Sequence, residues 1–325
     1  MTEIIVTGGA GFIGSHICEA FLAQGCHIIV IDSFDHYYDP AIKEKNIDCI
    51  RRHPALENGQ SLFTLYRTDI RDDLALHDIF RRHAGALVVH LAACAGVRPS
   101  IERPSLYYDV NVMGTLNILN AMRANGMKRL LFASSSSIYG ENRQAVFTED
   151  YPAMTPISPY AATKRSNELT CYTEHFLHGL SVVCLRFFTV YGPRQRPDLA
   201  IHKFTRAIMA GQPIELYGDG TTTRDYTFIH DIVNGVMGAA DWLNSQDCAY
   251  EIVNLGGGHS VTLTEMVAAI ENAIGKKAQI RYLPPQSGDV TRTSASIDKA
   301  RRLFGYHPQT PFQEGVNQFI RWYHE

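Results

Sequence analysis

A glycine-rich loop near the start of the chain lies between a short apolar strand and a helix, and it restricts the fold more than any other feature. The strand is expected at residues 4–6, the loop at Thr7 to Gly14, and the helix at residues 12–23. Glycines allow backbone amides to approach a pyrophosphate, and the helix N-terminus favours an anion. The pattern therefore predicts a nucleotide-binding loop; a tight turn without a ligand is the alternative.

One acidic residue refines that prediction. A second strand, at residues 27–31, ends at Asp32, roughly 20 residues after the loop. A carboxylate in this place accepts a hydrogen bond from the 2′-hydroxyl of an adenosine ribose and would repel a 2′-phosphate. NAD rather than NADP is therefore the expected cofactor. Asp69 and Ile70, which follow the third strand, are predicted to hold the adenine, with a plain turn as the alternative.

Strands and helices alternate through the first half of the chain. Further strands are expected at residues 62–66, 87–90, 129–133 and 182–186, and helices at 74–82, 105–125 and 159–178. Short apolar strands that alternate with helices predict a parallel sheet covered on both faces, the doubly wound α/β (Rossmann) fold. Ligands bind beyond the carboxyl ends of the strands in such sheets.

After residue 186 the pattern changes. Loops rich in Gly, Pro and Arg (191–197, 218–224, 284–292) alternate with helices expected at 199–211, 230–243 and 263–274. We expect residues 1–186 to form the NAD-binding domain and residues 187–325 to form mainly a smaller α/β substrate domain. Strand-like segments at 214–217 and 252–255 are expected to return to the first domain, most clearly in the region 225–255.

The overall composition excludes several kinds of partner. The net charge is −3 without a basic block, so neither a nucleic acid nor a membrane surface has electrostatic support. No apolar run approaches the ~20 residues that cross a bilayer, and no secretory signal precedes the first strand, so we expect a cytoplasmic protein. The seven cysteines are scattered and the histidines lack zinc-site spacing, so we expect reduced thiols and no metal.

Tyr160 and Lys164 form a candidate catalytic pair. Ser158-Pro159 predicts a helix start, and residues four apart share a helix face, so the phenol and the ammonium are expected side by side. A free tyrosine has a pKa of about 10, and a nearby cation favours the phenolate. Lys164 is therefore expected to lower the pKa of Tyr160. The alternative is a packed tyrosine with a solvated lysine one turn later.

A run of serines, residues 134–137, follows the strand expected at 129–133. The carboxyl end of this strand is where the nicotinamide part of the cofactor should lie. A hydroxyl there can share the proton that the Tyr160 phenolate removes, whereas a solvated turn is the alternative reading of the run. Beside Tyr160 and Lys164, the serines favour catalysis.

Together these motifs resemble an extended short-chain dehydrogenase/reductase, and more narrowly the nucleotide-sugar 4-epimerases. The resemblance extends over nearly the whole chain and includes the G-x-x-G-x-x-G spacing of the glycine loop. It implies that Tyr160 is the base, that Ser135 is the catalytic serine with Ser136 and Ser137 beside it, and that Lys164 binds the cofactor ribose. The NAD-binding residues that it implies are Gly8, Gly11, Phe12, Ile13, Gly14, Asp32, Asp69, Ile70, Leu91, Ala92, Ala93, Asn111, Ser134, Tyr160, Lys164 and Phe187.

The serine run also separates this chain from related enzymes. Sugar-nucleotide 4,6-dehydratases carry Asp-Glu where Ser136 and Ser137 stand, and the related decarboxylases usually carry a glutamate at the Ser137 position. Without such a carboxylate, elimination is disfavoured, and oxidation followed by return of the hydride remains. The resemblance therefore implies an epimerase; a net dehydrogenase, dehydratase or decarboxylase and a non-enzymatic NAD-binding protein remain as alternatives.

Three segments (32–40, 95–100 and 186–198) resemble the UDP-glucuronate 4-epimerases most closely, with a UDP-glucose/UDP-galactose 4-epimerase as the alternative. A sugar carboxylate is best bound by a guanidinium. The resemblance assigns this role to Arg196, with Thr189 adding a hydroxyl, although these arginines could instead bind the diphosphate or simply lie in a solvated loop. It further implies substrate contacts from Arg98, Tyr217, Arg224 and Asp289, and a homodimer formed through the helices expected at 105–125 and 159–178. Many epimerases have an arginine at the position of Gln286, so diphosphate binding is expected to rest more on Arg224.

Overall fold

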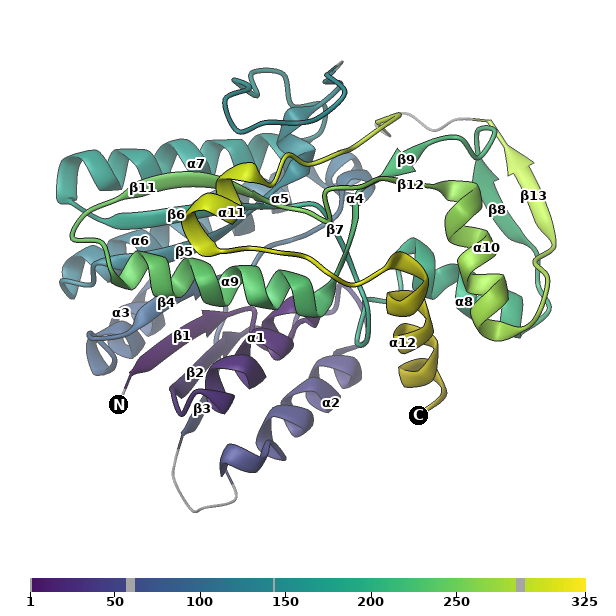
Figure 1. The fold of residues 1–325 in the computed structure, drawn as a ribbon. Helices are drawn as coiled ribbons and strands as arrows, with labels where there is room; N and C mark the ends of the chain where they lie inside the picture. Colours follow the sequence, from purple (N-terminus) through teal and green to yellow (C-terminus); the bar gives the residue numbers. More distant parts are fainter. Residues whose placement is uncertain (1, 57–61, 143, 285–289) are drawn as a thin grey trace.

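The computed structural model describes residues 2–56, 62–142, 144–284 and 290–325, and Figure 1 shows its ribbon. Within these residues, seven parallel strands form one sheet. In sheet order they are β11 (Tyr250–Leu255), β6 (Ser181–Phe187), β5 (Arg129–Ser135), β4 (Leu87–His90), β1 (Glu3–Thr7), β2 (His27–Asp32) and β3 (Phe63–Arg67). The doubly wound parallel sheet expected from the sequence is confirmed.

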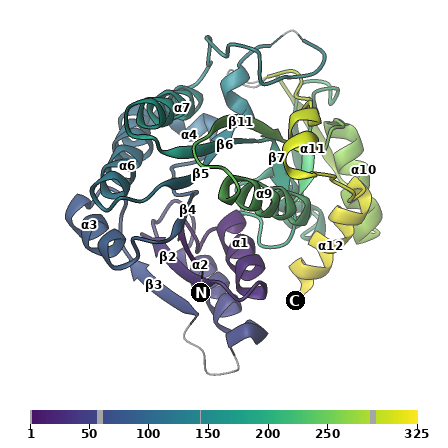
Figure 2. The same cartoon turned by 60° about the vertical axis from the view of Figure 1, so that its left-hand side comes forward.

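Helices cover both faces of this sheet, as Figure 2 shows. One face carries α3 (Asp73–Arg82), α6 (Gly114–Ala124) and α7 (Pro159–His178), and the other carries α1 (Phe12–Ala23), α9 (Ile229–Asn244) and α11 (Asp298–Phe304). Successive strand residues point to opposite faces, so Ile4 and Val6 join one hydrophobic core while Ile5 joins the other. Burial on both faces explains the continuous apolar runs of these strands.

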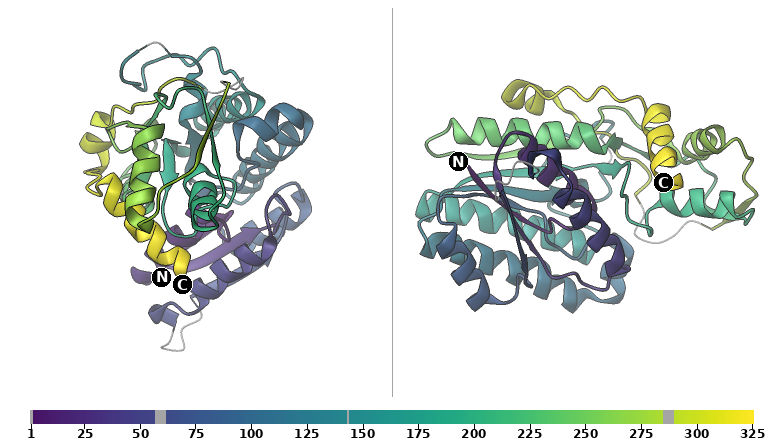
Figure 3. Two further views of the ribbon diagram at one scale, coloured as in Figure 1. Left: turned by 90° about the vertical axis from the view of Figure 1, so that its right-hand side faces the viewer. Right: turned by 90° about the horizontal axis from the view of Figure 1, so that it is seen from below.

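A smaller lobe lies beyond the carboxyl ends of the strands, on the right of Figure 1. It contains α8 (Ala200–Met209), α10 (Leu263–Ile274), α12 (Phe312–His324) and the strand pair β8 (Ile214–Tyr217) and β13 (Ile280–Leu283). The right-hand view in Figure 3 places the N-terminus on the sheet and the C-terminus on this lobe. Two further strand pairs join the parts: β7 (Thr189–Tyr191) with β10 (Tyr226–Phe228), and β9 (Thr223–Arg224) with β12 (Val261–Thr262).

Several segments differ from the expectations. Residues 214–217 do not return to the large sheet, because they pair in register with β13, whereas β11 does join it beside β6. The single helix expected at 105–125 is divided into α5 (Pro104–Tyr107), the π-helical segment η2 (Tyr108–Met113) and α6. Helix α2 (Pro40–Arg51) was not predicted, although Asp39 caps it by accepting a hydrogen bond from the amide of Ala41. The remaining short helices are η1 (Pro54–Leu56), α4 (Val97–Glu102) and η3 (Ser136–Tyr139).

The described helices include none that is both long and apolar enough to cross a membrane.

A buried ion pair fastens α7 to the sheet. Arg186 on β6 donates from Nε and Nη2 to the two carboxylate oxygens of Glu168 on α7, at 2.9 Å each, and both side chains are almost fully buried. The same carboxylate accepts from the hydroxyl of Ser134 on β5 at 2.6 Å and from Arg165 at 2.9 Å. Arg186 also donates to the phenol oxygen of Tyr139 at 2.9 Å. One carboxylate therefore connects the helix with two neighbouring strands.

Replacing Glu168 with alanine is expected to destabilise the protein strongly. The change leaves the Arg186 guanidinium buried without a counter-charge, and removing one partner of a buried ion pair costs about 3–5 kcal/mol. Urea unfolding of Glu168→Ala and of the parent measures the difference in the free energy of unfolding.

Glu44→Ala is the matched control, because Glu44 makes the same two-bond contact with Arg67 at the exposed surface, at 2.8 Å for each bond. Exposed pairs contribute about 0–1 kcal/mol, so this variant should unfold almost like the parent. Equal, small losses in the two variants would contradict a special role for the buried pair.

Candidate active site

A cavity of about 490 Å³ is lined by residues at the carboxyl ends of the strands and by residues of the loop before α8. Its wall brings together residues from the glycine loop, the serine run, α7 and the loop before α8. Of the residues predicted from the sequence, the wall contains Gly8, Gly11, Phe12, Ile13, Gly14, Asp32, Asp69, Ile70, Leu91, Ala92, Ala93, Ser134, Ser135, Ser136, Ser137, Tyr160, Lys164, Phe187, Thr189, Arg196 and Arg224. Side chains that are far apart in the sequence thus face one space.

The glycine loop has the close packing that a pyrophosphate cradle requires. Gly8 has a φ of +73°, and a Cβ there would lie only 2.9 Å from the backbone nitrogen of Ala92. A Cβ on Gly14 would collide with the carbonyl oxygen of Gly8. Backbone therefore lines the loop, which leads into the N-terminus of α1, where an anion is favoured. This part of the cavity fits the diphosphate of a dinucleotide.

Asp32 is buried at the end of β2, where its carboxylate accepts hydrogen bonds from other residues of the protein. It accepts hydrogen bonds from the amides of Ala10 (3.1 Å) and Phe34 (2.9 Å) and from the ammonium of Lys43 (3.0 Å). These donors fix the carboxylate at the place expected for the adenosine ribose. Lys43 also lines the cavity; it was not predicted as a site residue, because α2, the helix that carries it, was not predicted.

Two other residues predicted to bind the cofactor have specific partners. Asp69 lines the cavity and is paired with Arg71, whose Nε and Nη2 donate to it at 3.0 and 2.8 Å. Asn111 is buried behind the wall instead: its amide accepts from the Cys94 amide (2.7 Å) and donates to the Cys94 carbonyl (3.0 Å) and to Thr163 (3.1 Å). Asn111 therefore shapes the loop around Cys94 and does not face the cavity.

Tyr160 lies in the cavity next to Ser135. The pKa of Tyr160 is raised by burial, while a hydrogen bond with Ser135 and the positive charge of Arg196 act to lower it. Ser135 Oγ accepts from the amide of Ser137 at 3.2 Å and from its hydroxyl at 2.9 Å. Because these two bonds use the oxygen of Ser135 as acceptor, its own hydrogen is available to Tyr160. Ser135 and Arg196 are therefore the groups that favour the phenolate.

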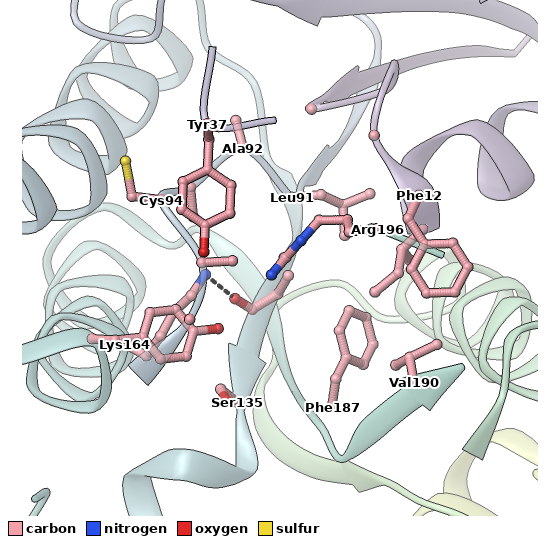
Figure 4. Close-up of a pocket in the computed structure, with 18 of the residues that line it drawn as sticks. Phe12, Tyr37, Leu91, Ala92, Cys94, Ser135, Lys164, Phe187, Val190 and Arg196 are labelled. Carbon is pink, nitrogen blue, oxygen red and sulfur yellow. Dashed lines mark hydrogen bonds between the residues drawn. The ribbon is translucent and has the colours of Figure 1, made fainter. Parts of the chain in front are cut away.

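Lys164 differs from the expectation. It shares the cavity wall with Tyr160, but its ammonium donates to the backbone carbonyl of Ala133 at 2.6 Å, the bond drawn as a dashed line in Figure 4. Burial lowers the pKa of Lys164 to about 8. The expected lowering of the Tyr160 pKa by Lys164 is not what the arrangement provides, because the ammonium is directed toward the end of β5.

At the opposite side of the cavity lies Arg196, with Tyr37 beside it; Figure 4 shows both directed toward the space near Lys164. Arg196 donates from Nε and Nη2 to the carboxylate of Asp198 at 2.9 and 2.8 Å. Thr189 and Arg224 complete this part of the wall, and Arg224 donates to the carbonyl of Thr223 at 2.9 Å.

The other predicted substrate residues lie elsewhere. Arg98 is exposed and stands over the ring of Tyr217, with its Cζ 5.2 Å from the ring centroid, and neither residue belongs to the cavity wall. Asp289 and Gln286 lie outside the described residues. Within the described chain, no three His, Cys, Asp or Glu side chains gather as a metal site.

Several contributing residues were not assigned a role from the sequence. Tyr37 and Asp198 occur in segments whose resemblance was noted, and that resemblance was the signal that could have found them. The signal for Lys43 and Glu168 was weaker. Lys43 lies in the first turn of a helix that Asp39 caps and Pro40 begins, and Glu168 continues the four-residue spacing of Tyr160 and Lys164.

Comparisons with known proteins agree with this geometry. A family model described as the NAD dependent epimerase/dehydratase family matches residues 4–256. A UDP-glucuronate 4-epimerase from Thermodesulfobacterium geofontis is 41% identical over 323 residues, which cover 99% of this chain and 96% of that protein.

Solved structures are similar over the full length. UDP-glucuronic acid 4-epimerase from Bacillus cereus, in complex with UDP-glucuronic acid and NAD, superposes with a TM-score of 0.91 at 33% identity, covering 99% of this chain and 98% of that one. UDP-glucose 4-epimerase from Thermus thermophilus, in complex with NAD, gives a TM-score of 0.86 at 34% identity, with 99% of each chain covered. By its sequence, its fold and its cavity, the chain belongs to the NAD dependent epimerase/dehydratase family.

Proposed function

We propose that this protein catalyses the NAD-dependent 4-epimerisation of UDP-glucuronate to UDP-galacturonate. The observation that carries the proposal is that the Tyr160 phenol and the Arg196 guanidinium line the same cavity, where the serine run supplies no carboxylate. A base and a carboxylate-binding group thus share one site. The likeness to the Bacillus cereus enzyme, which was solved with UDP-glucuronic acid and NAD, supports the same substrate.

A neutral hexose is the second candidate. The Thermus thermophilus UDP-glucose 4-epimerase is as similar in sequence as the Bacillus cereus enzyme, at 34% and 33% identity. Conversion of UDP-glucose to UDP-galactose would use the same chemistry at C4. It would leave Arg196 without an anionic partner in the substrate, and for this reason we favour the uronate.

The residues around the glycine loop hold the cofactor in this proposal. The amides at the start of α1 receive the diphosphate, Asp32 and Lys43 receive the adenosine ribose, and Asp69 and Ile70 flank the adenine. Leu91 to Ala93, Ser134 and Phe187 line the nicotinamide end, and Lys164 donates to the second ribose. When bound, NAD accepts the hydride from sugar C4 and later returns it to the opposite face.

Tyr160 performs the proton transfer. As a phenolate it removes the proton of the sugar 4-hydroxyl, and the hydroxyl of Ser135 stabilises the developing charge. Ser137 keeps Ser135 oriented by donating to its oxygen, and Ser136 adds a further hydroxyl to the wall. The 4-keto sugar then turns while its diphosphate stays bound, and Tyr160 gives the proton back to the oxygen at C4.

Arg196 and Thr189 bind the sugar carboxylate. The 4-keto form of a uronate is a β-keto acid, which loses carbon dioxide when the carboxylate aligns with the carbonyl π system. We assign to these two residues the task of holding the carboxylate out of that alignment. Arg224 binds the diphosphate, Asp289 contacts the nucleotide, and Arg98, which stands over Tyr217 outside the cavity wall, is a weaker candidate for substrate contact.

The parts of the chain divide these tasks. Residues 1–186, with the segments that return near 225–255, hold NAD, and residues 187–325 bind mainly the UDP-sugar.

All seven cysteines lie in the described part of the chain and are free thiols, which supports a cytoplasmic location.

We also propose a homodimer that forms through α7 and the helical segments beside it. Leu169, Tyr172 and Phe176 are 54%, 50% and 75% exposed on α7, and Met113 on η2 is 49% exposed. Spacings of three and four residues place the three α7 side chains on one helix face. An apolar stripe of this kind on a soluble helix is typical of a protein interface.

An NMR time course with UDP-glucuronate and no added reductant tests the proposed reaction. UDP-galacturonate should form without a build-up of NADH, because the hydride taken from C4 is returned to the same molecule. Tyr160→Phe should retain bound NAD and lose turnover. Conversion of UDP-glucose alone, release of carbon dioxide, or an active Tyr160→Phe variant would each contradict the proposal.

Ser135→Ala should move the pH dependence of kcat to higher pH. The hydrogen bond with Ser135 lowers the pKa of Tyr160, so its loss raises that pKa and leaves less phenolate at any given pH. A hydrogen bond to a charged group contributes about 1.5–3 kcal/mol, which corresponds to a shift of about one to two pH units in the acid limb. A uniformly slower enzyme with an unmoved acid limb would show that Ser135 does not tune Tyr160.

Phe176→Glu should convert the dimer into a monomer, because it introduces a charge into the apolar face of α7. Sedimentation velocity of the parent and the variant measures this change. Leu74→Glu is the matched control, since Leu74 is 83% exposed on α3, away from α7. A parent that sediments as a monomer, or a Phe176→Glu variant that stays dimeric, would refute the interface.

A further inference from the structure

The guanidinium of Arg196 already donates two of its hydrogen bonds to Asp198, a side chain of the same loop. Asp198 receives the Nε and Nη2 hydrogens of Arg196 at 2.9 and 2.8 Å, which is the side-on, two-bond arrangement. Arg196 is only 18% exposed, whereas Asp198 is 38% exposed. Asp198 therefore lies on the solvent side of the pair, and Arg196 lies on the cavity side.

Tyr37 holds the same pair from a different part of the chain. It follows Asp32 in the loop between β2 and α2, and its hydroxyl lies 3.5 Å from the second carboxylate oxygen of Asp198. The Arg196 Cζ stands 5.4 Å from the centroid of the Tyr37 ring, within the range of a cation–π contact. A residue next to the cofactor-binding strand therefore packs against the arginine on the substrate side.

These contacts leave a defined set of donors. A guanidinium has five N–H groups and can bind one carboxylate side-on and another end-on. Asp198 uses the side-on edge, and no atom of the described residues accepts a hydrogen bond from Nη1. The end-on edge, formed by Nη1 and the second hydrogen of Nη2, remains for a ligand in the cavity.

The charges of the pair favour this arrangement. Burial opposes the charged form of Arg196, but the hydrogen bonds with Asp198 outweigh it and raise the pKa of the guanidinium. Burial likewise opposes ionisation of Asp198, and the arginine nevertheless lowers its pKa. Both groups are therefore ionised, and the arginine is stable as a cation in a partly dry cavity before any sugar binds.

We propose that Asp198 and Tyr37 are positioning residues that make the site selective for an acidic sugar, because they hold Arg196 with its end-on edge toward the sugar carboxylate. The proposal rests on the function given above. A carboxylate then finds two donors already oriented, without the entropy cost of ordering a long flexible side chain. A neutral hydroxymethyl group gains little from the same edge, so the benefit of the arrangement is specific to uronates.

Binding measurements on the NAD-loaded protein in a Tyr160→Phe background, where no turnover interferes, test this role. Asp198→Ala should weaken UDP-glucuronate binding about tenfold, the effect of losing roughly one charge-assisted hydrogen bond, and should change UDP-glucose binding by less than about twofold. Asp198→Asn keeps one acceptor oxygen and should restore part of the affinity. Tyr37→Phe should have the same selective effect with a smaller magnitude.

Two reference variants define the scale. Arg196→Ala gives the full loss of selectivity, and Asp78→Ala, which removes an aspartate paired with Arg81 and Arg82 on the exposed side of α3, should change nothing. Thermal melting and NAD content establish that each variant is folded and loaded.

The outcomes separate the two proposals. Equal weakening for both sugars, or tighter binding of UDP-glucuronate, in Asp198→Ala would overturn the role of Asp198 and leave the proposed substrate intact. A parent protein that binds UDP-glucose as tightly as UDP-glucuronate and converts only the former would overturn the proposed substrate together with this role.

Discussion

The buried contact between Glu168 and Arg186 is the interaction on which the arrangement of the site depends. Tyr160, Lys164 and Glu168 are successive members of one four-residue spacing, so they lie along the same side of α7. The carboxylate at the end of this row binds β6 through Arg186 and β5 through Ser134. When that end of the row is fixed, Lys164 reaches the carbonyl of Ala133, and Tyr160 lies next to Ser135. The buried carboxylate of Glu168 thus determines where the phenol of Tyr160 lies at the carboxyl ends of the strands.

Two kinds of interaction change the pKa values of side chains in the site: burial, and contacts with specific donors. Burial raises the pKa of Tyr160 and lowers that of Lys164, so it acts against the charged form of both. Specific donors act in the opposite direction on Tyr160: a hydroxyl from the end of β5 and a guanidinium from the loop before α8. The sheet and the smaller lobe each supply one of these groups. The phenol is therefore tuned by both parts of the molecule, although it belongs to only one of them.

The sequence predicted the features that depend on local pattern. The apolar runs predicted the parallel sheet, and Gly8 to Gly14 with Asp32 predicted where a dinucleotide lies. It did not reveal contacts that depend on the path of the loops. Lys43 meets Asp32 because α2 packs against α1 beside the glycine loop, and Asp198 meets Tyr37 because two distant loops converge. The ammonium of Lys164 was expected beside the phenol, but spacing on a helix defines a shared face and leaves the direction of a long side chain open.

The return of β11 to the edge of the sheet has a consequence for how the molecule can be divided. The chain leaves the sheet after β6, comes back with α9 and β11, and returns once more with α11, while one hydrophobic core runs from the helix-covered face of the sheet into the smaller lobe. A fragment ending near residue 186 would expose β6 as an unpaired edge strand and uncover the apolar surface beneath α9. We therefore expect residues 1–186 not to fold as an independent module, because the large sheet is completed by segments that follow them in the chain.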